Sequence, residues 1–160
     1  MTKSPQMSQF GVGPQIIRKP MLFAIGAAIA TALFPSLLHA YLIPANISIG
    51  LGIVLGIVGG GMIFTGSKTM KAAHKADTLA TYSIYALTRN PLYAAWILCI
   101  FPAIALITGA YLVILTSALA YSSFKKQIHV EDDYLAERFG QVYEEYRGKT
   151  NELVPWFPRH

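Results

Sequence analysis

Three long stretches of the chain are apolar and carry no formal charge, and they constrain the fold more than any other feature of the sequence. They cover residues 21–42, 47–66 and 91–124. An α-helix needs about 20 apolar residues to cross roughly 30 Å of hydrocarbon. In a bilayer, backbone polar groups must find partners within the protein, and a helix satisfies them internally. The sequence therefore predicts an all-α integral membrane protein.

Composition and charge support this prediction. Of the 160 residues, 54% are hydrophobic and only 13% are charged, and the mean hydropathy is +0.44. These values are too apolar for an ordinary soluble domain, so we expect one membrane domain over residues 1–160, embedded in a lipid bilayer. The net charge of +5 does not indicate a nucleic-acid partner, because the Lys and Arg residues lie outside the apolar stretches rather than on one face. Cys99 is the one cysteine, which leaves no intrachain disulfide and no Cys/His metal site.

Prolines, glycines and polar residues divide the chain into expected segments. Pro35 is expected to kink the first helix, Thr108-Gly109 to break the third apolar stretch, and Gly140 to interrupt an amphipathic helix over residues 131–147. The expected segments are a flexible arm (1–18), about four transmembrane helices (21–42, 47–66, 92–107 and 110–127) and a cytoplasmic C-terminal cap (129–160) with an aromatic anchor at residues 154–158.

The positive charges predict how these helices are oriented. They lie before the first apolar stretch, after the second and after the third: Lys3, Arg18, Lys19, Lys68, Lys71, Lys75, Lys125 and Lys126. Neither connection on the other side contains Lys or Arg. Because cytoplasmic loops carry the excess of positive charge, we expect a multi-pass protein of the plasma or inner membrane with both termini in the cytoplasm.

The second apolar stretch is unusually rich in glycine. The pairs Gly52/Gly56 and Gly56/Gly60 have the small-xxx-small spacing that lets helices approach closely in lipid. We interpret this face chiefly as a packing surface, which allows a homo-oligomer through this helix. A cofactor lying against the glycines is the alternative.

The polar chemistry is concentrated in residues 77–93 and in Glu131-Asp132. By the expected topology both lie at the cytoplasmic face, where Arg89, Tyr85 and Tyr93 can converge with the acidic pair. A carboxylate near the bilayer is unfavourable unless a cation of the protein or of a ligand is close to it. Two interpretations stay open at this point: an Arg89–Glu131 ion pair that holds helices together, or a binding site.

Two linked motifs favour a binding site. The segment from Leu79 to Tyr93 resembles the pattern Leu-Val-Thr-x-Gly-x-Tyr-x-x-x-Arg-His-Pro-x-Tyr, and the segment from Glu131 to Tyr146 resembles Glu-Glu-x-x-Leu-x-x-x-Phe-Gly-x-x-Tyr-x-x-Tyr. Both patterns belong to the isoprenylcysteine carboxyl methyltransferase and phospholipid methyltransferase-like membrane enzymes. They occur here in the family's order, separated by a hairpin of the expected kind.

The resemblance implies an enzyme that uses S-adenosylmethionine, bound at the cytoplasmic side, to methylate a lipophilic or small membrane-partitioned acceptor. Arg89 and Glu131 are the residues that it places at the reacting centre. The cofactor contacts that it implies are Asp77, Thr78, Leu79, Ala80, Tyr85, Asn90, Pro91, Leu92, Tyr93 and Glu131. A carboxylate can bind the methionyl ammonium, and tyrosine faces favour a sulfonium cation.

Departures from the family pattern bear on the acceptor. Asn90, Ser83 and Asp132 replace the usual His, Gly and Glu. Gln127, at the expected substrate-binding position, stands where the carboxyl methyltransferases have an arginine that orients the substrate carboxylate. Lys126 is an imperfect substitute, because it lies about 100° around the helix.

Two alternative functions remain at the level of sequence. One is a carboxyl methyltransferase acting on prenylated cysteine, which the Gln127 departure disfavours. The other is a non-enzymatic membrane scaffold or subunit, in which the glycine-rich helix associates and Arg89 pairs with Glu131.

Overall fold

The computed structural model describes residues 13–156. The expected arm up to residue 12 and the anchor residues Phe157 and Pro158 lie outside this range. Every regular element in the described part is helical: α1 (Gly13–Leu33), α2 (Pro35–Leu38), α3 (Ala45–Lys75), a 3-10 turn η1 (Ser83–Ala86), α4 (Pro91–Ala94), a π-helical segment η2 (Ala95–Ile100), α5 (Phe101–Thr108), a second 3-10 turn η3 (Tyr111–Ile114), α6 (Leu115–Phe139) and α7 (Gln141–Lys149).

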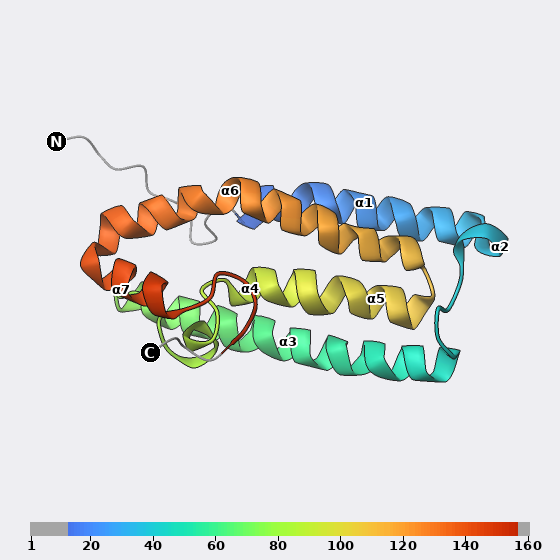
Figure 1. Cartoon of the computed structure of the whole chain (residues 1–160), viewed down its shortest axis with the longest axis horizontal. Helices are drawn as coiled ribbons and strands as arrows, with labels where there is room; N and C mark the ends of the chain where they lie inside the picture. Colours follow the sequence, from blue (N-terminus) through green and yellow to red (C-terminus); the bar gives the residue numbers. More distant parts are fainter. Residues whose placement is uncertain (1–12, 157–160) are drawn as a thin grey trace.

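The long helices form an elongated bundle (Figure 1). α1 packs along α6, and α3 packs along α5. Three helical stretches of the described chain are long and apolar enough to cross a membrane, namely residues 16–33, 45–75 and 91–108. The fourth long helix, α6, is apolar only in its first part. The all-α membrane class predicted from the sequence is confirmed.

The first helix has different ends from those expected. It begins at Gly13, so residues 13–18 are helical rather than part of a flexible arm, and it ends at Leu33 instead of continuing to residue 42. Pro35 ends this helix and does not merely kink it. The reason is steric, since a residue before proline avoids the helical region, and Phe34 has φ −126° and ψ 58°.

The second helix is longer than expected, because α3 continues past Gly66 to Lys75. At 1.5 Å per residue its length is about 46 Å, well beyond the hydrocarbon thickness of a bilayer. The added turns carry Lys68, Lys71 and Lys75, and basic residues near a helix C-terminus interact favourably with the helix dipole. The lysines therefore mark the end of the apolar stretch in the sequence, but the helix α3 continues through them.

The third apolar stretch forms the expected hairpin, with a longer second arm. Residues 91–108 make one run through α4, η2 and α5, and Gly109 turns the chain at φ +66°. Pro102 explains the π-helical segment, because its ring would clash with the carbonyl of Leu98 in a regular α-helix. The expected helix over 110–127 begins only at Leu115 and extends to Phe139, so the first half of the expected 131–147 helix belongs to α6. Gly140, at φ +55°, separates α6 from α7 as predicted.

The glycines of α3 pack against the hairpin of the same chain. Gly52 faces Ala103 and Ile107, and Gly59 faces Cys99 and Ile100. Gly66 continues this row and meets Leu92, so the contacting glycines recur every seven residues. Gly56 makes only an ordinary contact and Gly60 meets nothing within 4 Å. The predicted close packing is confirmed, but its register differs from the predicted Gly52/Gly56 and Gly56/Gly60 pairs.

This packing predicts that alanine substitutions at Gly59 and Gly60 have opposite effects on stability. Gly59→Ala should lower the free energy of unfolding by about 1–3 kcal/mol, because the new Cβ would lie 2.8 Å from the Cβ of Cys99. Gly60→Ala, which enters open space, should stabilise the helix by up to ~1 kcal/mol. Thermal unfolding in detergent, followed by circular dichroism, measures both. Equal effects of the two substitutions would contradict the packing described here.

Candidate active site

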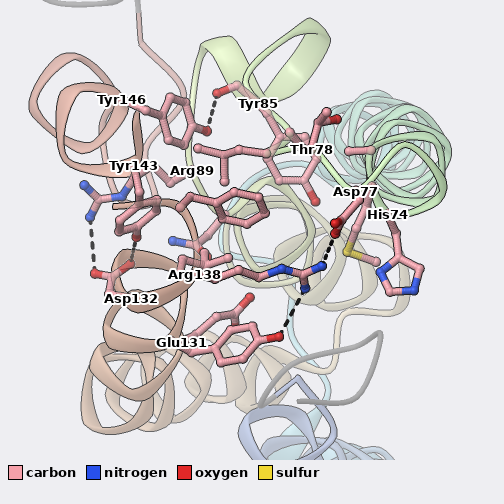
Figure 2. Close-up of a pocket in the computed structure, with 18 residues that line it drawn as sticks. His74, Asp77, Thr78, Tyr85, Arg89, Glu131, Asp132, Arg138, Tyr143 and Tyr146 are labelled. Carbon is pink, nitrogen blue, oxygen red and sulfur yellow. Dashed lines mark hydrogen bonds and ion pairs between the residues drawn. The ribbon is translucent and has the colours of Figure 1, made fainter. Parts of the chain in front are cut away.

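Two cavities lie at the end of the bundle where α3 ends and α4 begins. A cavity of about 160 Å³ lies between the chain that follows α3 and the second half of α6 (Figure 2), and we name it the polar cavity because it is lined by more charged side chains. A second cavity of about 270 Å³, named the apolar cavity, lies beside it against α1 and the α4–η2 helix, and Arg89 and Glu131 are its charged lining residues. Five residues line both cavities: Met70, Tyr85, Arg89, Asn90 and Glu131. The two spaces therefore adjoin at these side chains.

The predicted site residues divide between the cavities. The run after α3, from Asp77 to Ala80, lines only the polar cavity. The run from Pro91 to Tyr93 lines only the apolar cavity, together with Ile17 and Trp96. Tyr85, Asn90, Arg89 and Glu131 stand at the boundary. Of the predicted positions, Gln127 lines neither cavity, although it lies one helical turn before Glu131 on α6.

Glu131 faces the tyrosines of the boundary. The Tyr93 hydroxyl donates a hydrogen bond to Oε2 of Glu131 at 3.2 Å. The pKa of Tyr85 is raised well above its usual range, first by burial and second by the negative charge of Glu131. Tyr85 therefore stays a neutral phenol at physiological pH, and the boundary between the cavities combines one carboxylate with uncharged aromatic groups.

Arg89 pairs with Asp132, the residue next to the Glu131 that was considered from the sequence. Nη2 of Arg89 lies 3.6 Å from Oδ2 of Asp132, and both side chains are about nine-tenths buried. The Tyr143 hydroxyl also donates to Asp132 (Figure 2). Burial, with a further contribution from this hydrogen bond, raises the pKa of Tyr143, so the phenol remains a donor. The two neighbouring acidic residues of α6 thus differ, because Asp132 neutralises Arg89 and lines only the polar cavity, whereas Glu131 lines both cavities.

The C-terminal segment after α7 fixes the loop that carries Arg89. The backbone N–H of Arg89 donates to the Asn151 carbonyl at 2.9 Å, and its Nη1 donates to the Arg147 carbonyl at 3.1 Å. The side-chain amide of Asn90 donates to the Glu152 carbonyl at 2.9 Å. Within the described residues, Nε of Arg89 is buried without a hydrogen-bond partner. The segment therefore positions the loop, and Asn90 contributes to that contact with its side chain.

Some lining residues were not singled out from the sequence. Arg138 and Tyr134 line the polar cavity, and Trp96 lines the apolar one. A helical repeat from Glu131 through Tyr134 to Arg138 is present in the sequence and is the signal that could have found the first two. No comparable sequence pattern singles out Met70 of α3, which lines both cavities.

Backbone strain at Ser83 gives a test of the loop. Ser83 has φ +59°, a left-handed conformation that favours glycine, and it stands where the family pattern has Gly. Ser83→Gly should therefore raise the free energy of unfolding by about 0.5–1 kcal/mol. Glycine removes the penalty of the left-handed conformation, and its greater entropy in the unfolded chain offsets part of this gain. Ser122→Gly, at an exposed position inside α6, should lower it by about 0.5 kcal/mol. Destabilisation by both substitutions in thermal unfolding would contradict this account.

Comparisons with known proteins identify a family that the chain matches. A family model described as phospholipid methyltransferase matches residues 47–142, which contain all but the first two residues of α3, the hairpin and α6. The protein-S-isoprenylcysteine O-methyltransferase of Schizosaccharomyces pombe is 31% identical over 85 residues, which are 53% of this chain and 36% of that protein. The chain thus spans little more than a third of this relative's length. No solved structure matches it.

The family model includes the boundary residues Met70, Tyr85, Arg89, Asn90 and Glu131. It also spans more than half of the chain, which therefore belongs to the phospholipid methyltransferase family.

Proposed function

We propose that this protein transfers a methyl group from S-adenosylmethionine to a lipophilic or small membrane-partitioned acceptor. The observation that carries the proposal is the junction of two cavities at Tyr85, Arg89 and Glu131, of which one is lined by more charged side chains than the other. Methyl transfer requires two reactants to be held in line and away from water. A polar cavity for the cofactor beside an apolar cavity for the acceptor meets that requirement.

The residues of the polar cavity fit the cofactor. The carboxylate of Glu131 can bind its ammonium group, and the buried Tyr85 and the half-buried Tyr146 can offer ring faces to its sulfonium. The unpartnered Nε of Arg89 is a buried donor at the same boundary. When bound, S-adenosylmethionine supplies a methyl group carried on a positively charged sulfur. The residues from Thr78 to Ala80 line the same cavity, and their backbone groups can contact the adenosine part of the cofactor.

The apolar cavity suits the chain of a lipid-like acceptor. Ile17, Leu92 and Trp96 line it, and each comes from a helix that belongs to a candidate membrane span. These side chains can hold an apolar chain and exclude water from the boundary. Tyr93, which hydrogen-bonds Glu131, closes the polar end of this space.

The charges at the boundary favour an acceptor other than a carboxylate. Arg89, the one guanidinium of a described residue that lines both cavities, is already neutralised by Asp132. Gln127 has no charge and lines neither cavity. We therefore propose an amine or a thiol as the reacting group.

We further propose that the site faces the cytoplasm and that the protein is multi-pass. Arg18, Lys68, Lys71 and Lys75 lie at the end of α1 and α3 that holds the cavities (Figure 1). The turns at the other end, residues 34–46 and 109–114, contain no Lys or Arg. This asymmetry supports a cytoplasmic position for the cavity end.

The test is a transfer assay with the protein in lipid vesicles and S-adenosylmethionine labelled in its methyl group. Phosphatidylethanolamine, a long-chain thiol and a farnesylated cysteine derivative serve as amine, thiol and carboxylate acceptors. We expect label in the amine or the thiol and none in the carboxylate. Transfer to the carboxylate alone would contradict the proposed acceptor class, and no transfer to any acceptor would contradict the activity.

A further inference from the structure

Two arginines line the polar cavity, and their surroundings differ. Arg89 is held by the buried Asp132 and by the Arg147 carbonyl. Arg138 pairs with Asp77, which lies across the cavity on the chain after α3 (Figure 2). The side chains of this second pair are 37% and 80% exposed. An exposed ion pair contributes little and is easily exchanged, so Arg138 is the arginine that can accept another anion.

Arg138 lies on the same face of α6 as Glu131. The two residues are seven positions apart, which is close to two full helical turns, and Tyr134 lies between them. Helical side chains lean toward the N-terminus of their helix. Arg138 does so here, because its Nη1 donates to the Tyr134 hydroxyl at 3.1 Å. The guanidinium is thus linked to Tyr134, the residue between Arg138 and Glu131 on this face of α6.

We infer that Glu131 and Arg138 together bind the two charges of an α-amino acid group, with Glu131 at the ammonium and Arg138 at the carboxylate. The inference rests on the proposed function, in which this group is the methionyl end of S-adenosylmethionine. It assigns a cofactor contact to Arg138, a position outside the contacts that the family resemblance implies. Asp77 holds the guanidinium over the cavity while no ligand carboxylate is there.

The exchange is electrostatically balanced. The ligand carboxylate replaces the carboxylate of Asp77, so the charge next to Arg138 does not change. Asp77 is mostly exposed and returns to water when it is released. During this exchange the hydroxyl of Tyr134 keeps Nη1 of Arg138 in place by accepting its hydrogen bond.

The experiment is a calorimetric titration of the full chain in detergent with three ligands. S-adenosylhomocysteine has both charges of the amino acid group, decarboxylated S-adenosylmethionine keeps only the ammonium, and 5′-methylthioadenosine has neither. Arg138→Gln should weaken S-adenosylhomocysteine binding by about 10- to 100-fold, the range for a lost hydrogen bond to a charged group. Binding of the other two ligands should not change, and Arg138→Lys should restore part of the lost affinity.

Arg147→Gln is the matched control, because Arg147 lies on α7 outside both cavities and holds Arg89 only through its backbone carbonyl. This variant should bind all three ligands as the wild type does. An equal loss for all three ligands in Arg138→Gln would assign Arg138 a structural role and overturn the inference, as would unchanged binding of S-adenosylhomocysteine. Failure of the folded wild type to bind any ligand would overturn the proposed function itself, and this inference with it.

Discussion

Replacing Glu131 by glutamine is expected to weaken the binding of S-adenosylhomocysteine by roughly 2–5 kcal/mol, the cost of removing one partner of a buried charge pair. This corresponds to a loss of affinity of about 30-fold or more. Glu131 lines both cavities and accepts a hydrogen bond from Tyr93. Glutamine keeps the size of the side chain and an acceptor for that hydroxyl, so the change removes chiefly the negative charge.

Calorimetric titration measures this loss, and thermal unfolding without ligand shows whether the variant is folded. Glu137→Gln is the control, because Glu137 is exposed on the same helix and lines neither cavity. It should bind as the wild type does. Unchanged affinity in folded Glu131→Gln would show that the carboxylate does not contact the cofactor.

Removing Asp132 is expected to have the largest effect on stability. Asp132→Ala leaves Arg89 buried without its carboxylate and leaves the Tyr143 hydroxyl without its acceptor. Breaking a buried ion pair by removing one partner costs about 3–5 kcal/mol. We expect a loss of this size in the free energy of unfolding, measured by titration with a denaturing detergent.

Asp133, the next residue on α6, provides a comparison for the effect of Asp132→Ala on stability. Asp133 is exposed, and Asp133→Ala should change the free energy of unfolding by less than ~0.5 kcal/mol. A double variant, Arg89→Leu with Asp132→Leu, tests the cause, because it removes both charges and should be more stable than Asp132→Ala. If Asp132→Ala and Asp133→Ala had the same effect, the buried pair would not stabilise the fold.

The sequence predicted the class of the protein, and its motifs singled out residues that the structure places around two cavities. Long uncharged stretches specify membrane helices, because little else satisfies the backbone in lipid. The turns at Gly109 and Gly140 were also predictable, and both residues have positive φ. The two motifs located Tyr85, Arg89 and Glu131, which now lie at one boundary.

Helix ends and side-chain pairing could not be predicted in the same way. Lys68 and Lys75 end an apolar stretch, yet they continue α3, because charge does not interrupt backbone hydrogen bonds. Glu131 and Asp132 are adjacent and differ by about 100° around α6, so either could face Arg89 until the helices are placed. The contact between Asp77 and Arg138 joins residues 61 positions apart, which no local pattern specifies.

The most direct test of the central claim is a titration of the wild-type protein, purified in detergent, with S-adenosylmethionine and separately with S-adenosylhomocysteine. One molecule of either ligand is expected to bind per chain, in the polar cavity. Absence of binding by both ligands, in protein shown to be folded, would contradict the assignment of this cavity to a methyl donor.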